Sequence, residues 1–185
     1  MDLLALFAGD KANQADHQAY FQAKDMHQNG SDPYEIWNKT GWFRGPDGNW
    51  RFELDDSKAK MQEKSGTLAE VFQHGGGLYE NYPKLLDTQI NYAPRTGGIE
   101  AGNFNTQYGN IGITPDKSQG DDPMKTMIHE LQHAIQKQQG WSMGANVRSA
   151  GYQENPGEAE ARTAAARAQM SPEERRRMPP WEMWK

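Results

Sequence analysis

The sequence predicts an α+β protein with a small mixed sheet, and three observations carry this prediction. Residues 123–135, PMKTMIHELQHAI, have the apolar spacing of a helix. Residues 42–55, WFRGPDGNWRFELD, place two aromatic-rich runs around a strong turn signal, as in a β-hairpin. A second long helix is expected after Asn155-Pro156, where the alanine-rich run GEAEARTAAARA begins.

The first of these helices has clear signals at both ends. Asp122 suits the N-cap, Pro123 suits the first helical position, and Gly140 is a suitable stop. Apolar residues recur at helical spacing and form one stripe: Met124, Met127, Ile128, Leu131 and Ile135. At about 100° per residue, His129 and His133 fall roughly opposite the centre of that stripe. We therefore expect one side to pack on a core and the other to present the histidines.

The histidines belong to an H-E-x-x-H motif formed by His129, Glu130 and His133. Residues four apart on a helix lie on one face, so both imidazoles can reach one ion. Catalytic zinc sites use three protein ligands plus a water, and a glutamate beside that water can take its proton. The motif predicts a metal-assisted hydrolase. A surface helix that carries two histidines by chance is the alternative.

The candidates for a third ligand are Glu158 and Glu160 in the second long helix. The two are separated by about 200° around a helix, so they cannot both face one ion. Glu158 could instead close a capping box after Asn155, and Glu160 could be a solvated charge beside Arg162 or Lys137. The pattern alone leaves both open.

Weaker signals mark the other elements. Residues 1–29 have helical alanine spacing, residues 34–39 suit a short helix, and strands are expected over 88–92, 99–104 and 109–114. The strand 109–114 could lie at the edge of a cleft and pair with an extended peptide, or be an ordinary core strand. Near the end of the chain, Ser171 and Glu174 form a capping-box pattern, and Trp181 and Trp184 could pack back on the core.

Composition excludes several classes of protein. The 185 residues carry a net charge of −5 without a large basic patch, so nucleic acid is not an expected partner. The chain has no cysteine, which excludes a disulfide framework and a cysteine zinc site. The short apolar run near the N-terminus is a poor signal peptide and too short to span a membrane. His17 and His27 have no ligand spacing, and His74 could be a ligand but has no partner nearby in the sequence. Residues 75–77 lack the lysine of a phosphate loop.

Segments of the two long predicted helices carry a family resemblance. Residues 129–136, HELQHAIQ, together with 157–162, GEAEAR, resemble the zincin-like metallopeptidase domains of phage and mobile-element large polyvalent proteins. Residues 40–56 and 79–90 resemble further segments of those proteins, so the similarity covers roughly residues 40–180. The loop QQGWSMGANV departs from the family pattern, which indicates a different substrate choice. We accordingly expect a helical N-terminal segment over 1–40 and a zincin-like domain over 41–185.

The resemblance implies a gluzincin-type zinc metallopeptidase that hydrolyses peptide bonds in a protein or peptide substrate. It implies His129, His133 and Glu158 as zinc ligands, with Glu130 as general base and Glu160 outside the ligand set. Tyr152, or with less support Arg148, would donate to the developing oxyanion. The chain would be part of a longer polyvalent or virion protein, in the bacterial host cytoplasm or a phage particle. The alternatives are a catalytically inactive binding or virion-associated module, and hydrolysis of a cell-wall peptide.

Overall fold

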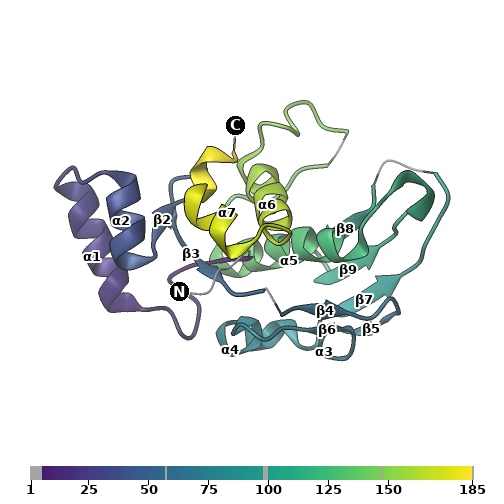
Figure 1. Cartoon of the computed structure of the whole chain (residues 1–185). Coiled ribbons are helices and arrows are strands. Elements are labelled where there is room, and N and C mark those ends of the chain that lie inside the picture. Colours follow the sequence, from purple (N-terminus) through teal and green to yellow (C-terminus); the bar gives the residue numbers. More distant parts are fainter. Residues whose placement is uncertain (1–5, 57, 98–99, 147, 185) are drawn as a thin grey trace.

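The computed structural model of the chain describes residues 6–56, 58–97, 100–146 and 148–184. These residues form an α+β structure with small sheets, as the sequence predicts. Two helices, α5 (Pro123–Gln139) and α6 (Pro156–Arg167), pack on each other in the middle of the molecule. Figure 1 shows them between a four-stranded sheet on one side and a pair of N-terminal helices on the other.

The four-stranded sheet is mixed and has the strand order β5-β7-β9-β8. Its strands are β5 (Gly66–Thr67), β7 (Gln89–Tyr92), β8 (Gly102–Asn105) and β9 (Asn110–Ile113). Strand β9 runs parallel to β7 and antiparallel to β8, while β5 is antiparallel to β7. The strand predicted over 109–114 is therefore an internal core strand. The edge position belongs to β8, because β9 has a partner on each side.

The predicted hairpin is confirmed. Strands β2 (Phe43–Arg44) and β3 (Trp50–Leu54) are antiparallel and flank the Gly-Pro-Asp-Gly turn. The other edge of β3 pairs with β1 (Leu6–Ala8), which completes a three-stranded sheet. A separate antiparallel pair joins β4 (Lys60–Met61) to β6 (Phe72–Gln73).

The prediction of one helix over residues 1–29 is wrong at its start. Within the described residues, Leu6, Phe7 and Ala8 form strand β1 and are fully buried. Helix α1 (His17–Gln28) begins only after Asp16, whose side chain accepts a hydrogen bond from the Ala19 N–H. Alanine spacing cannot reveal β1, because its partner β3 lies more than forty residues further along the chain.

The remaining helices are short. Helix α2 (Pro33–Thr40) confirms the element expected over 34–39, and helices of three to six residues follow later in the chain. These are α3 (Leu68–Val71), η1 (Pro83–Leu85), η2 (Lys117–Gln119), α4 (Leu78–Asn81), α7 (Pro172–Arg177) and η3 (Pro180–Glu182). The predicted capping box at Ser171 and Glu174 begins α7.

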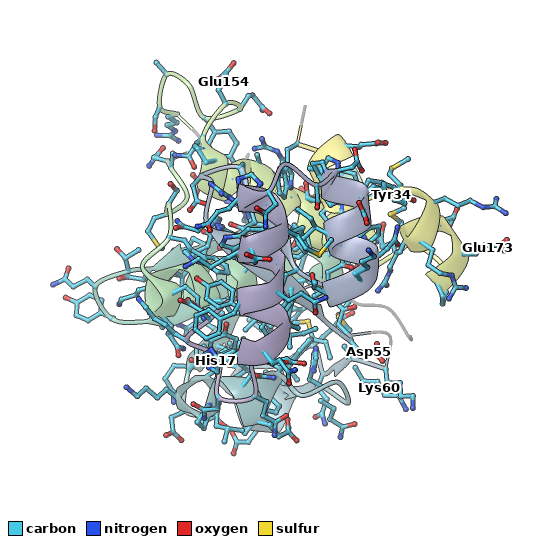
Figure 2. All side chains as sticks on the ribbon, turned by 90° about the vertical axis from the view of Figure 1, so that its left-hand side faces the viewer. His17, Tyr34, Asp55, Lys60, Glu154 and Glu173 are labelled. Carbon is cyan, nitrogen blue, oxygen red and sulfur yellow. The ribbon has the colours of Figure 1, made fainter. Side chains whose placement is uncertain are left out.

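The C-terminal end packs against the N-terminal helices. Figure 2 shows α1 and α2 side by side, with Tyr34 on the α2 side toward α7. The Tyr34 hydroxyl donates to the Arg176 carbonyl at 3.1 Å. Trp181 and Trp184 pack against the main core, as expected. In the described part of the chain, no helix has the length and apolar character needed to cross a membrane.

One main core joins these elements. It includes Phe7 of β1, Ile111 of β9, and Met127, Ile128 and Leu131 of α5, all of them at most 1 % exposed. The apolar stripe predicted for α5 therefore faces the core. The boundary predicted near residue 40 stays a prediction.

Candidate metal centre

Helix α5 positions two imidazoles side by side. The Asp122 side chain accepts from the Met124 N–H at 2.9 Å, and Gly140 ends the helix with φ at 74°. The His129 and His133 rings lie one turn apart, with centroids 4.8 Å from each other and planes at 84°. Their Nε2 atoms are 3.1 Å apart, so both rings aim the same nitrogen at one point.

Helix α6 supplies a carboxylate to that point. Its N-cap Asn155 accepts from the Glu158 N–H at 3.0 Å. The Glu158 side chain does not close a capping box but lies against both imidazoles. Its Oε2 is 3.3 Å from His129 Nε2, and its Oε1 is 3.4 Å from His133 Nε2. One donor atom from each of the three residues lies within 4.8 Å of the others.

The three side chains fit a zinc ion. Tetrahedral zinc with bonds of about 2.0–2.2 Å separates neighbouring ligand atoms by about 3.4 Å. The two imidazole nitrogens are 3.1 Å apart, and each lies near a different Glu158 oxygen, His129 3.3 Å from Oε2 and His133 3.4 Å from Oε1, distances close to that value. Glu158 Oε2 is buried and accepts no hydrogen bond from the described residues, and a cation would satisfy it. Two imidazoles and one carboxylate are also a donor set that suits zinc.

Close backbone approach covers the cluster. A Cβ on Gly144 would lie 2.4 Å from Glu158 Oε1 and 2.8 Å from His133 Nε2, so only glycine leaves the space between the ligands open. The next residue, Ala145, donates its N–H to Glu158 Oε1 at 3.0 Å. Gly157 lets this loop lie on α6, because a Cβ there would be 2.4 Å from the Met143 backbone.

The tautomer of His133 is fixed by Gln136. The Gln136 amide nitrogen donates to the Gly157 carbonyl at 2.9 Å and to Glu160 Oε2 at 3.1 Å, and both partners only accept. The amide oxygen must therefore face His133 Nδ1, 2.8 Å away. Nδ1 then carries the proton, and the lone pair of neutral His133 is on Nε2, which faces Glu158.

The pKa values of the three side chains are shifted in different directions. Burial lowers the pKa of His129 below its ordinary value. Burial acts in the same direction on His133, but the Glu158 and Glu130 carboxylates outweigh it and raise the pKa of that imidazole. Burial of Glu158 is likewise outweighed by the two imidazoles, which hold the pKa of this carboxyl well below its usual range. Glu158 is thus anionic at neutral pH, as a ligand needs to be.

Glu130 lies next to the cluster on the wall of a cavity. Burial raises the pKa of its carboxyl to about 7, and Glu158 and Glu100 add to the effect, while His133 and the Phe104 backbone N–H oppose it. Strand β8 can approach this carboxylate because a Cβ on Gly102 would be 3.0 Å from Glu130 Oε1. A group with this pKa exchanges protons readily near neutral pH.

Of the other predicted site residues, only Tyr152 lies at the cavity. Tyr152 lines the same cavity, and burial and the Glu158 carboxylate raise the pKa of its phenol to about 12, so it is a proton donor at neutral pH. Arg148 is exposed and is not among the described residues that line the cavity. Glu160 turns away from the imidazoles and is bound by Arg51, with Nε 2.9 Å from Oε1.

The cavity has a volume of about 530 Å³ and lies between strand β8 and the loop that carries Gly144. A second hollow of about 650 Å³ shares His129, Glu130 and Tyr152 with it and extends toward Asp121 and Lys125. Both hollows reach His129 and Glu130, and Gly102 of β8 lines both.

Sequence reasoning missed Gln136 and Gly144. Gln136 could have been found, because it lies three residues after His133 and therefore on the same helix face. Gly144 gives no such signal, because it lies in an irregular loop whose path depends on the packing of α5 and α6.

One part of the chain is similar to a known protein family. Residues 5–62 match the model of a family described as large polyvalent protein associated domain 23. This match supports the predicted relation to large polyvalent proteins, and it covers β1, α1, α2 and the β2–β3 hairpin but not α5 or α6. No curated protein and no solved structure shows significant similarity to the chain.

The close approach of Gly144 gives a testable prediction. In Gly144→Ala, the added methyl group would displace His133 and Glu158, and we expect Zn²⁺ affinity to fall about 10- to 100-fold, as when ligand orientation is lost. Competition with a chelating dye measures this affinity. Gly75→Ala is the matched control, because its Cβ would meet only the flexible Lys58 side chain at 3.3 Å. Equal affinities for the two variants would contradict the prediction.

Proposed function

We propose that the chain is a zinc-dependent metallopeptidase of the gluzincin type within a zincin-like fold. The observation that supports this most directly is the convergence of His129, His133 and Glu158: the imidazole Nε2 atoms are 3.1 Å apart, and each lies within 3.4 Å of a Glu158 oxygen. A purely structural site has no use for the Glu130 carboxylate beside the ligands, and a structural zinc normally has four protein ligands. Among the described residues, the cluster has three.

Glu130 would act as the general base. A bound zinc ion would supply Lewis-acid chemistry, polarising a substrate carbonyl and acidifying a water molecule. Glu130 would accept a proton from the attacking water and transfer it to the amine nitrogen as the C–N bond breaks. A pKa near neutrality suits both steps. The Tyr152 hydroxyl would donate a hydrogen bond to the developing oxyanion.

The shape of the cleft supports an extended peptide as substrate. Strand β8 is at the edge of its sheet, and no other strand of the described residues pairs with its outer side. Gly102, Asn103 and Phe104 of this strand line the cavity. An extended chain could add to this edge by main-chain hydrogen bonds and pass the imidazoles.

The alternative function is that of a catalytically inactive binding module. The observation that favours it is the match of residues 5–62 to a large polyvalent protein associated domain, which describes an association and not an activity. A zincin-like fold in such a protein could hold a partner with the same cleft.

The metal site is tested by elemental analysis of the purified chain. We expect about one zinc per chain, and loss of that zinc in His133→Ala, because two remaining ligands bind zinc weakly. His27→Ala is the control, because this histidine is on α1, contacts Arg44, and should keep the zinc. A wild-type chain that neither contains nor takes up zinc would contradict the proposed site.

The general base is tested with Glu130→Gln, which keeps the shape of the side chain. This variant should keep its zinc but lose about 10²- to 10⁴-fold in turnover, the usual contribution of general-base catalysis. Cleavage of a quenched fluorescent peptide library gives the rate. Glu100→Gln, on the same cavity wall, should reduce the rate far less. If the wild type holds zinc and cleaves no member of the library, the binding-module alternative is favoured.

Zinc affinity should depend on pH in a defined direction. His133 has a raised pKa, so its proton competes with the metal at a higher pH than that of an ordinary histidine. Below the pKa of His133, the zinc dissociation constant should rise about tenfold per pH unit for each proton displaced. Dye competition at pH 8 and pH 6 measures the change. The same affinity at both pH values would show that His133 is not a ligand.

A further inference from the structure

A buried arginine lies behind the metal centre. Arg51 of β3 is 0 % exposed, and its guanidinium stacks 3.6 Å from the centre of the Trp141 ring. The guanidinium also lies close to Gly45, where a Cβ would be 2.4 Å from the guanidinium carbon. The space around the guanidinium is therefore closed, and its position is fixed.

Arg51 holds two carboxylates. Its Nε and Nη2 donate to Glu160 at 2.9 and 3.1 Å, a two-bond contact that fixes the carboxylate plane. Its Nη1 pairs with Asp47 of the hairpin turn at 2.7 Å. Burial alone would raise the pKa of Asp47, but hydrogen bonds from Arg51 and the Asn49 backbone outweigh burial and lower this pKa to about 2.

We propose that Arg51 is a positioning residue for the metal centre, acting through Glu160 and Gln136 on the His133 imidazole. Each link is a direct hydrogen bond: Arg51 donates to Glu160, Glu160 accepts from the Gln136 amide, and the Gln136 oxygen accepts from His133 Nδ1. This series of contacts keeps the His133 lone pair on Nε2, toward Glu158. The identity of the metal rests on the proposed function, whereas the effect on His133 does not.

Arg51 connects the segment that matches the polyvalent-protein family to the metal centre. Arg51 and Asp47 both lie within residues 5–62, whereas the three candidate ligands lie outside. The same segment has a second contact with the site, because the Ser142 N–H donates to Asp47 Oδ2 at 3.2 Å, at the start of the loop that carries Gly144. Asp47 of the hairpin turn thus contacts both Arg51 and the loop that carries Gly144.

The protein contains a matched control pair between the same two elements. Glu53 of β3 pairs with Arg167 of α6 at 2.6 Å, and both side chains are at most 2 % exposed. This pair has the charges reversed relative to Arg51 and Glu160. Arg167 also donates to the Met178 carbonyl, so its contacts lead away from the imidazoles. Removal of the Glu53–Arg167 pair should therefore leave the metal centre undisturbed.

The experiment compares three variants of the full chain. Gln136→Met removes the last link, Arg51→Met with Glu160→Met removes the ion pair, and Glu53→Met with Arg167→Met is the control. Each double variant removes both charges of its own ion pair. Asp47, which loses Arg51 in one of them, keeps the hydrogen bonds from the Asn49 and Ser142 N–H groups. The measurements are Zn²⁺ affinity by dye competition, the His133 tautomer by imidazole ¹⁵N NMR of the metal-free chain, and stability by denaturant unfolding.

We expect a graded result. Zinc affinity should fall about 10- to 100-fold in Gln136→Met, and about tenfold in the Arg51 pair variant, where the Gly157 carbonyl still holds one amide proton. The control should change affinity less than about threefold, whether its stability rises or falls. Combining Gln136→Met with the Arg51 pair variant should lower zinc affinity little further than Gln136→Met alone, because both changes act through the hydrogen bond between Gln136 and His133.

Two results would overturn the proposal. One is a His133 tautomer that stays Nδ1-protonated in both the Gln136 and the Arg51 variants, and the other is an equal loss of zinc affinity in the control pair. If the Arg51 pair variant does not fold, Gln136→Met and Arg51→Lys, which keeps the charge but not the two-bond contact, decide the question by the same tautomer measurement. A wild type that binds no zinc would reject the proposed function, and the metal-free tautomer would still test Arg51.

Discussion

The structure depends on burying the polar face of α5. The apolar stripe of this helix faces the main core, but α6 and β1 cover the opposite side, so Gln132, His133 and Gln136 are also buried. Buried polar groups are costly unless they are hydrogen-bonded. Gln132 is satisfied by the Phe7 backbone, which donates to its amide oxygen at 2.9 Å and accepts from its nitrogen at 3.1 Å. The need to pair every such group determines which elements can lie against the helix.

The same constraint explains why Glu158 and not Glu160 faces the imidazoles. Two buried ion pairs, Arg51–Glu160 and Glu53–Arg167, join β3 to α6 with opposite polarity. An α6 rotated by half a turn would leave a buried arginine and glutamate unpaired, which costs several kcal/mol per charge, on the order of 3–5. With α6 held in this rotation, Glu160 points to the hairpin, and Glu158 points to the opposite side, where the histidines are.

The sequence predicts the local parts of this arrangement well and the long-range parts poorly. The α5 caps, the hairpin and the H-E-x-x-H spacing depend on residues near one another, so composition and periodicity predict them. The choice between Glu158 and Glu160 depends on Arg51, more than one hundred residues earlier, and no local pattern contains that contact. Strand β1 and the edge position of β8 are missed for the same reason, because both are defined by partners distant in the sequence.

The two carboxylates nearest the imidazoles have opposite electrostatic environments. Both imidazoles hold the Glu158 carboxylate in its anionic form, whereas burial and neighbouring acids keep Glu130 partly protonated near neutral pH. Carboxylates whose pKa values are separated in this way can perform different tasks in one site. An anion fixed between two imidazoles suits a metal ligand, and a group that titrates near pH 7 on the cavity wall suits proton transfer. The separation arises from position: Glu158 lies in the first turn of α6, beside the histidines, and Glu130 lies against β8 where Gly102 permits close approach.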